Sequence, residues 1–261
     1  MSPARSGGRP RVVSLVPSLT EAVAETGPGL LVGVTDWCSH PADLGAGVRR
    51  IGGTKNPDVP AVLALRPDLV IANEEENRAV DLDALRAAGA RVLVTEVRTL
   101  PQALTELDRL LTHALRLPRP AWLDEAARAW ERADARAERT RRPTRTALVP
   151  IWRRPWMALG RDTFAGDLLA RLGVRNALAG HPERYPRLPS GPGQPLAAAR
   201  AAGCELVVLP DEPYRFSAQD GPEAFPGLPA ALVDGRALTW YGPSLREAPA
   251  VLAGALDAAR P

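Results

Sequence analysis

The sequence predicts an α/β fold with two lobes, each built on a parallel sheet. Short apolar runs alternate with helical patterns along the 261 residues. Each run is continuously apolar, which is typical of parallel strands covered on both faces. The segments ALRPDLVIANEEEN and AARAAGCELVVLPDEP share one layout of helix end, buried strand and acidic loop. This weak internal repeat favours two similar lobes over a single sheet.

The first lobe is expected over residues 11–118. Ser18 and Glu21 form an S-x-x-E pattern, which predicts a capping box at the start of a helix. Pro57 and Asp58 predict the start of another helix. The strands of this lobe are predicted at residues 11–16, 31–34, 68–72 and 91–95, and its other helices at 80–88 and 99–117.

A helix from Pro120 to about Arg141 is expected within a linking segment at 119–143, and the second lobe follows at 144–261. Its strands are predicted at 146–152, 205–209 and 237–240, and its helices at 162–172, 194–202 and 246–259. The loops at 176–195 and 210–230 are rich in proline and glycine. They are long enough to predict a functional role.

The charge pattern argues against a nucleic-acid partner. The chain has 33 basic and 30 acidic residues, a net charge of +3 and a pI near 9.3. The basic run from Arg132 to Arg145 alternates with acidic residues on a helical pattern, so it predicts a solvated helix face. Cys38 and Cys204 lie too far apart in sequence to indicate a disulfide framework.

The N-terminus, MSPARSGGRPR, is basic, but the apolar run VVSLV that follows it is shorter than a signal peptide requires. No lipid-attachment cysteine lies near the start, and no stretch approaches the roughly eighteen apolar residues that span a bilayer. The chain as written is therefore expected in the cytoplasm. It is expected outside the inner membrane if the start codon is misassigned.

No motif indicates nucleotide binding or hydrolysis. GGTKNPD lacks the GK[ST] of a phosphate loop, LGVRNALAG does not form GxGxxG, and GxSxG and HExxH do not occur. His113 lies in a helical pattern, and His181 has no neighbour at ligand spacing. We therefore assign no catalytic residue.

The stretch DWCSHP, from Asp36 to Pro41, follows a predicted strand and should lie at the carboxyl edge of the first sheet, where open α/β sheets bind ligands. Cys38 and His40 have a spacing that can chelate a soft metal, although a closed site needs more ligands. The alternative is that Cys38 packs as a small hydrophobe and His40 caps a turn.

Aromatic side chains follow several predicted strand ends. Together they predict the walls of a pocket for a large flat ligand, although core packing is the default for each one alone. These residues are Trp37, Trp152, Trp156, Trp240 and Tyr241. The acidic loop Glu74–Glu76 is expected to be mostly solvated, with a docking surface for a basic partner as the alternative.

Three segments of the first lobe carry a resemblance to a known family: VVSLVPSLTEAV, VGVTDWCSHP and RIGGTKNPDVPAVLALRPDLVIANEEEN. They resemble the helical-backbone (class III) substrate-binding proteins of ABC importers, which serve cobalamin, haem, ferric siderophores and some metals. The cobalamin-binding branch is the most similar. The second lobe matches more loosely, through ALGRDTFAGDLLARLG, GCELVVL and TWYGPS.

The resemblance implies two Rossmann-like lobes joined by one long rigid α-helix, with a ligand held non-covalently in the cleft between them. The family's aromatic contacts match Trp37 and Trp240, and Trp152 and Trp156 border the same region. The family's first docking acid would fall near Ala79, which is not acidic. The docking candidates are therefore Glu75, Glu76 and Glu247.

The sequence thus predicts a non-catalytic receptor for a corrinoid-like or other metal-chelate ligand, which needs no cofactor of its own. Cobalamin is the expected ligand, with haem and a ferric siderophore as alternatives. Thr54, Lys55 and Asn56 are expected to meet its polar substituents, and Cys38 or His40 its metal. The expected partner is an ABC permease, and the expected state is a monomer. The alternatives are a chelatase-like enzyme using His40 and His181, and an intracellular sensor or chaperone.

Overall fold

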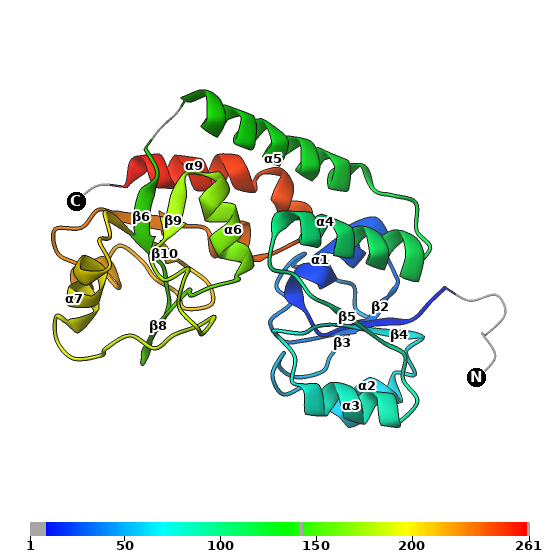
Figure 1. Cartoon of the computed structure of the whole chain (residues 1–261). Helices are drawn as coiled ribbons and strands as arrows, with labels where there is room; N and C mark the ends of the chain where they lie inside the picture. The colour runs from blue at the N-terminus through cyan, green and yellow to red at the C-terminus, as the bar shows by residue number, and fades with distance from the viewer. Residues whose placement is uncertain (1–8, 141–142, 260–261) are drawn as a thin grey trace. The chain divides into compact units, whose positions relative to one another are not determined.

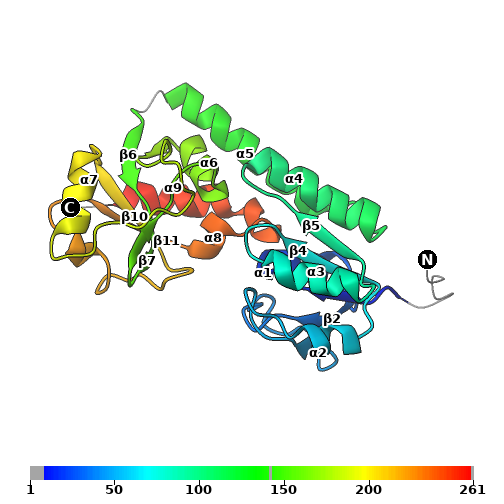
Figure 2. The same cartoon turned by 60° about the horizontal axis from the view of Figure 1, so that its bottom comes forward.

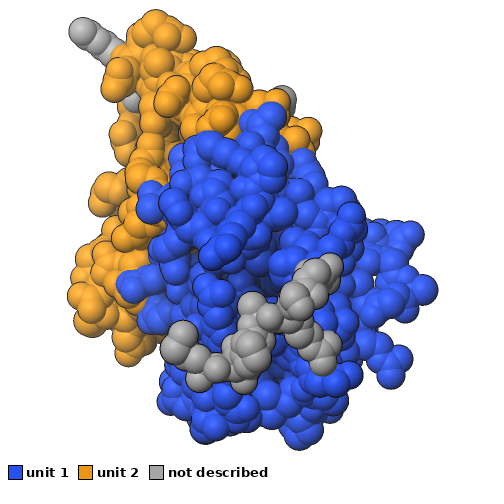
Figure 3. Space-filling model, turned by 90° about the vertical axis from the view of Figure 1, so that its right-hand side faces the viewer, with its two compact units in different colours: residues 1–96, 104–123, 241–243 blue, residues 97–103, 124–240, 244–261 orange. Residues whose placement is uncertain are grey.

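The computed structural model describes residues 9–140 and 143–259 (Figure 1). Most of the basic N-terminal stretch, and Arg141 and Arg142 of the basic run, lie outside these residues. The chain forms two compact units (Figure 3). Unit 1 comprises Met1–Glu96, Leu104–Leu123 and Tyr241–Pro243, and unit 2 comprises Val97–Ala103, Asp124–Trp240 and Ser244–Pro261. No helix among the described residues is long and apolar enough to cross a membrane.

Unit 1 is built on a five-stranded parallel sheet in the order β3-β2-β1-β4-β5. The strands are β1 (Val12–Ser14), β2 (Leu31–Val34), β3 (Arg49–Arg50), β4 (Leu69–Asn73) and β5 (Val92–Thr95). Because the strand order reverses between β1 and β4, the topological switch point lies there. Ligands of open α/β sheets bind beyond the carboxyl ends of the strands at such a point.

Helices cover both faces of this sheet (Figure 1). The helices of this part of the chain are α1 (Pro17–Thr26), α2 (Val59–Ala64), α3 (Ala79–Ala87), α4 (Leu100–Asp108) and the π-helical η1 (Arg109–Ala114). Val62 of α2 and Leu82 and Leu85 of α3 pack in one buried cluster with Val13 and Val70 of the sheet. Helices α2 and α3 therefore share a face.

Unit 2 has a four-stranded parallel sheet in the order β11-β10-β6-β9, with its switch point between β10 and β6 (Figure 2). Its strands are β6 (Arg145–Leu148), β9 (Val174–Asn176), β10 (Leu206–Pro210) and β11 (Ala230–Val233), and an antiparallel pair, β7 (Pro150–Arg153) and β8 (Trp156–Ala158), follows β6. The remaining helices are α5 (Ala121–Thr140), α6 (Phe164–Arg171), α7 (Gln194–Ala201), η2 (Pro222–Ala224), α8 (Gly235–Thr239), η3 (Pro243–Arg246) and α9 (Ala248–Ala258).

The predicted α/β fold with two parallel sheets is confirmed, and so is the helix start at Asp58, but the capping box predicted for the first helix is wrong. Helix α1 begins at Pro17 and has Val16 at its N-cap without a side-chain hydrogen bond, so Ser18 and Glu21 form no capping box. Helix α2 begins at Val59, where the side chain of Asp58 accepts a hydrogen bond from Ala61 N at 2.9 Å. A side-chain cap satisfies one of the otherwise unpaired amides of a helix start.

The predicted strand at 237–240 is also wrong, because this segment belongs largely to α8. The side chain of Asp234 accepts a hydrogen bond from Ala237 N at 2.8 Å and starts the helix, and the last parallel strand is the earlier β11. The predicted strand at 146–152 is two strands. After Leu148 the chain leaves the parallel sheet, and β7 pairs with β8 instead.

Candidate functional site

Three loops of unit 1 follow strands at the carboxyl edge of its sheet. Residues 35–41 follow β2, residues 52–56 lie beyond β3, and residues 74–77 follow β4. Because the carboxyl ends of parallel strands meet at one edge, these loops gather beside the switch point. They carry most of the side chains that the sequence singled out in the first lobe.

Trp37 is the most exposed large apolar side chain on this edge, at 69%. Its indole lies over the backbone of Gly53, where a Cβ would be 3.5 Å from Trp37 Nε1. His40, Lys55 and Asn56 are exposed as well. An indole with polar neighbours on the ligand-binding edge can offer flat apolar contact to a small molecule.

Cys38 faces the interior, in contrast to its neighbours. Its side chain is fully buried, and Sγ lies 3.0 Å from Thr20 Oγ1 and 3.2 Å from Thr35 Oγ1. Burial raises the pKa of the thiol. His40 Nδ1 instead meets Ser39 Oγ at 3.1 Å. Within the described residues no group of three or more His, Cys, Asp or Glu side chains could hold a metal ion.

Two asparagines that the sequence analysis did not single out fix the acidic loop after β4. Asn73 Oδ1 accepts hydrogen bonds from Glu75 N at 2.9 Å and Glu76 N at 3.2 Å. Asn77 is buried, and its Oδ1 accepts from Asn73 N at 2.9 Å. The N-x-x-x-N spacing could have indicated this arrangement, since asparagine side chains commonly bond nearby backbone in loops.

Asn77 also ties this loop to its neighbours. Its Nδ2 donates to Leu15 O, just after β1, at 3.2 Å and to Thr54 O at 2.9 Å. The Lys55 ammonium donates to Glu75 O at 2.5 Å. The loops at the switch point therefore form one connected backbone surface.

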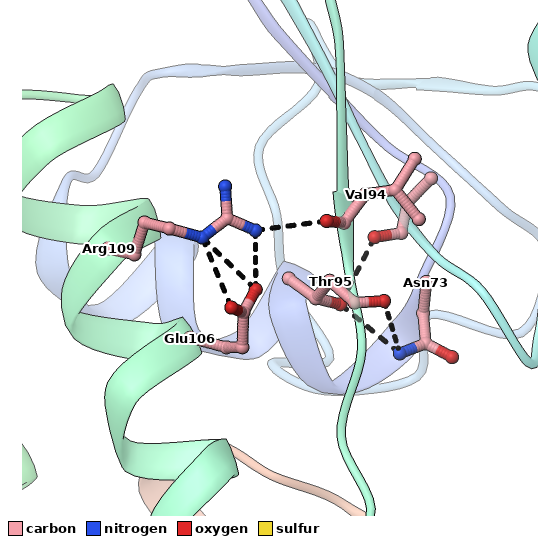
Figure 4. A network of polar contacts seen from close by, with 6 residues as sticks. Asn73, Val94, Thr95, Glu106 and Arg109 are labelled. Carbon is pink, nitrogen blue, oxygen red and sulfur yellow. Dashed lines mark hydrogen bonds and ion pairs between the residues drawn. The ribbon is translucent and has the colours of Figure 1, made fainter.

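The network extends from Asn73 to the helices (Figure 4). Asn73 Nδ2 donates to Thr95 O at 3.1 Å and to Thr95 Oγ1 at 3.2 Å. From η1, Arg109 donates to Val94 O at 2.9 Å and pairs with Glu106 of α4. The ends of β4 and β5 are thus anchored by side chains as well as by the sheet.

We expect Asn77→Ala to lower the free energy of unfolding by about 3 kcal/mol. The substitution removes the hydrogen-bond partner of two backbone carbonyls and one backbone amide. Each buried polar group that loses its partner costs about 1–3 kcal/mol. Denaturant unfolding followed by circular dichroism measures the change, with the exposed Asn56→Ala as control. A loss below about 1 kcal/mol would contradict the role given to Asn77.

The segment Tyr241–Pro243 belongs to unit 1 and lies at the same edge. Tyr241 is buried, and its hydroxyl lies close to the side chains of Thr95 and Ser18. A Cβ on Gly242 would lie 3.0 Å from Ser18 O, so only glycine fits this approach without displacement.

A titratable pair lies beside this segment. Burial, and next the charge of Glu75, raise the pKa of Glu76 to about 8 against the opposing effect of Lys55. Burial, and next the carboxyl of Glu76, raise the pKa of Tyr241 well above its ordinary value. Glu76 is therefore mostly protonated at neutral pH.

In unit 2 the predicted aromatic residues divide into exposed and buried ones. Trp152 is 41% exposed. Trp156 and Trp240 are buried. Trp156 stacks on Phe216 with ring centroids 5.9 Å apart, and Trp240 Nε1 donates to Glu212 Oε2 at 3.1 Å. Of these three tryptophans, Trp152 alone offers a broad free face.

The other residues considered from the sequence are placed as follows. Glu247 is exposed at the N-cap of α9, where its side chain makes no capping hydrogen bond. His181 Nδ1 accepts a hydrogen bond from Glu183 N at 3.0 Å, which ties the imidazole ring to its own loop. Thr54 is partly buried and precedes the exposed Lys55 and Asn56 in the 52–56 loop.

Comparisons with known proteins agree with this architecture. Residues 12–199 match the family model described as periplasmic binding protein. Vitamin B12-binding proteins of Pectobacterium carotovorum and Yersinia pestis are 24% and 26% identical over 183 and 182 residues. These matches cover 68% of this chain but 65% and 63% of those proteins, which is less than two thirds of their length.

Solved structures are similar over almost the whole chain. A periplasmic haem-binding protein from Pseudomonas aeruginosa is 26% identical, with a TM-score of 0.75 over 96% of this chain and 94% of that one. The periplasmic vitamin B12-binding protein of Vibrio cholerae is 16% identical, with a TM-score of 0.70 over 95% and 96%. With a family model that spans most of its length and the same two-sheet architecture, the chain belongs to the periplasmic binding protein family, a family of non-catalytic binding proteins of ABC transporters.

Proposed function

We propose that this protein is a receptor that binds a metal chelate of the cobalamin or haem class for uptake by an ABC importer. The observation that carries the proposal is Trp37, an exposed indole on the carboxyl edge of the unit 1 sheet. Tryptophan is enriched where proteins contact ligands and partners, and this edge is where open α/β sheets receive ligands.

The surroundings of Trp37 suit a large chelate with a polar rim. The indole offers a flat apolar face, and burying such a face contributes roughly 25 cal/mol per Å² of apolar area removed from water. Lys55 and Asn56 are exposed on the neighbouring loop, which also contains the partly buried Thr54. These side chains can bond amide, carboxylate or hydroxyl groups on the ligand.

Cobalamin is the first ligand proposed, because the similar proteins of Pectobacterium and Yersinia are vitamin B12-binding proteins. Haem is the main alternative, supported by the similar haem-binding structure from Pseudomonas aeruginosa. A ferric siderophore is the third. Of the two residues proposed to reach a ligand metal, His40 is exposed and Cys38 is buried, which favours His40.

An ABC permease is the proposed partner, with Glu75, Glu76 and Glu247 as docking candidates. Glu76 is mostly neutral at pH 7 because its pKa is raised to about 8. A neutral carboxyl cannot pair with a basic partner surface. Glu247, which is exposed, is therefore the stronger candidate.

A spectroscopic titration tests the proposal. Purified protein is titrated with cobalamin, haem and a ferric siderophore, and tryptophan quenching and the visible spectrum of each ligand are followed. We expect saturable binding of one of them, weakened at least about tenfold by Trp37→Ala, since truncating a central aromatic anchor costs 2 kcal/mol or more. Val80→Ala, which removes an exposed apolar side chain of α3, is the control. Failure of all three ligands to bind would overturn the proposal.

A further inference from the structure

The turn that carries Trp37 spans residues 35–38 and directly follows β2, and we call it the Trp37 turn. Cys38 N donates to Thr35 O at 3.2 Å and closes the turn. The side chain of Trp37 is 69% exposed, whereas that of Cys38 is fully buried. The turn therefore directs its indole into solvent and its thiol into the interior of unit 1.

The guanidinium of Arg50 joins the two ends of the Trp37 turn. Its Nη1 donates to Thr35 O at 2.7 Å and to Cys38 O at 2.9 Å, so one nitrogen serves the first and the last carbonyl of the turn. Arg50 is the register partner of Val34 in the pairing of β2 with β3, and the turn begins at the residue after Val34. This register places the Arg50 side chain within reach of both carbonyls.

The other contacts of the Trp37 turn are neutral. On the buried side, Cys38 Sγ lies 3.2 Å from Thr35 Oγ1, and a thiol is a weak donor and a weak acceptor. Towards β3, Asp36 N donates to Gly52 O at 2.8 Å. Hydrogen bonds from an ionised donor are roughly twice as strong as those between neutral groups. Arg50 therefore supplies the strongest link between the ends of the turn.

Arg50 is not part of the core. Strand β3 consists of Arg49 and Arg50 alone, it lies at the edge of the sheet, and both residues are exposed. Replacing an exposed side chain at a sheet edge leaves the buried cluster of unit 1 untouched. The loss of the Arg50 guanidinium should therefore show itself as local motion of the Trp37 turn and not as unfolding of the lobe.

We propose that Arg50 is a positioning residue for ligand binding, which fixes the Trp37 turn so that the indole is held in place before the ligand arrives. Ordering the backbone of a mobile turn costs free energy, and a turn that is ordered beforehand avoids this cost during association. Arg50 acts through Trp37 and not by touching the ligand. The inference rests on the proposed receptor function and adds a residue to it.

The first measurement needs no ligand. Nitrogen-15 relaxation gives the order parameters of the backbone amides in the Trp37 turn. We expect values of roughly 0.85 in the wild type and below roughly 0.6 in Arg50→Met, which keeps the apolar stem and removes the donors. Arg49→Met, which removes the adjacent exposed guanidinium, is the matched control and should leave the turn ordered. Thermal melts verify that each variant is folded.

Arg50→Lys separates the clamp from a general effect of substitution. In the wild type a single nitrogen serves both carbonyls, and an ammonium also brings several donors on one nitrogen. We therefore expect Arg50→Lys to keep the turn ordered. Equal loss of order in Arg50→Lys and Arg50→Met would contradict the clamp.

The second measurement is the affinity for cobalamin, iron protoporphyrin and a ferric siderophore. We expect Arg50→Met to weaken by about tenfold whichever chelate the wild type binds, because the ordering cost is then paid on binding. In a Trp37→Ala background the same substitution should change the affinity by less than about twofold, since the effects of residues that act through one another are not additive. Arg49→Met should bind like the wild type.

The outcomes separate this inference from the proposed function. If a chelate binds but the turn stays ordered in Arg50→Met, the positioning role is wrong and the receptor function stands. The same holds if Arg50→Met weakens binding equally with and without Trp37, because Arg50 would then contact the ligand itself. If none of the three chelates binds the wild-type protein, the proposed function fails together with the inference.

Discussion

Gly160→Ala is expected to lower the free energy of unfolding by about 3 kcal/mol, because a side chain at this position has no room. A Cβ on Gly160 would lie 2.0 Å from Glu183 O and 2.9 Å from Pro186 Cδ. Gly160 N also donates to Arg184 O at 2.7 Å, so the two backbones are held together. Relief requires separating this segment from the end of β8, and forced overpacking costs about 1–3 kcal/mol or more.

Gly254→Ala is the matched control. Gly254 lies within α9, and a Cβ there would meet no heavy atom within 4 Å. Replacing a helical glycine by alanine stabilises by up to about 1 kcal/mol. Denaturant unfolding followed by circular dichroism compares both variants with the wild type. A Gly160→Ala protein within 1 kcal/mol of wild type would show that the 183–187 segment is not packed as described.

The second large effect is a dependence of stability on pH that comes from Glu76. Its pKa is raised from 4.5 to about 8 in the folded protein. Between these values the folded chain binds more protons than the unfolded chain, so the free energy of unfolding falls as pH rises from about 5 to 8. The contribution of one such group is at most about 1.4 kcal/mol per pH unit.

Glu76→Gln isolates this contribution, because glutamine resembles the protonated carboxyl and does not titrate. We expect the variant to match the wild type near pH 5 and to exceed its stability by more than about 1 kcal/mol at pH 8.5. The neighbouring Glu74→Gln, at an exposed position, should leave the pH profile unchanged. Parallel profiles for wild type and Glu76→Gln would show that this carboxyl titrates normally.

Much of the fold follows from local pattern. The strands of unit 1 are continuous apolar runs between turn residues. Strands β1, β2 and β5 lie within the predicted ranges, and β4 extends one residue beyond its predicted range. The segment ALTW has the same apolar character, but Asp234 caps it as a helix, and a four-residue run cannot discriminate the two states by periodicity. Strand order requires tertiary information, since nothing in the pattern places β1 beside β4.

The candidate site was harder to predict than the fold. The position of Trp37 after a strand was sufficient to expect it at the carboxyl edge of the unit 1 sheet, where the structure places it. Trp156, like Trp37, is a tryptophan near a strand end, but it is buried. Its burial depends on packing with the 186–188 segment, thirty residues away in the chain. Arg187 and Met157 are brought side by side by cross-strand register, which the sequence does not reveal.

The measurement that tests the account most directly is equilibrium dialysis of the purified protein against cobalamin, iron protoporphyrin and a ferric siderophore, followed by analysis of the ligand recovered after denaturing the protein. A non-catalytic receptor predicts saturable uptake of one of these chelates at one site per chain, and recovery of the chelate unaltered and with its metal. Uptake of none of the three, or recovery of a chelate that has lost its metal or been chemically altered, would contradict the account.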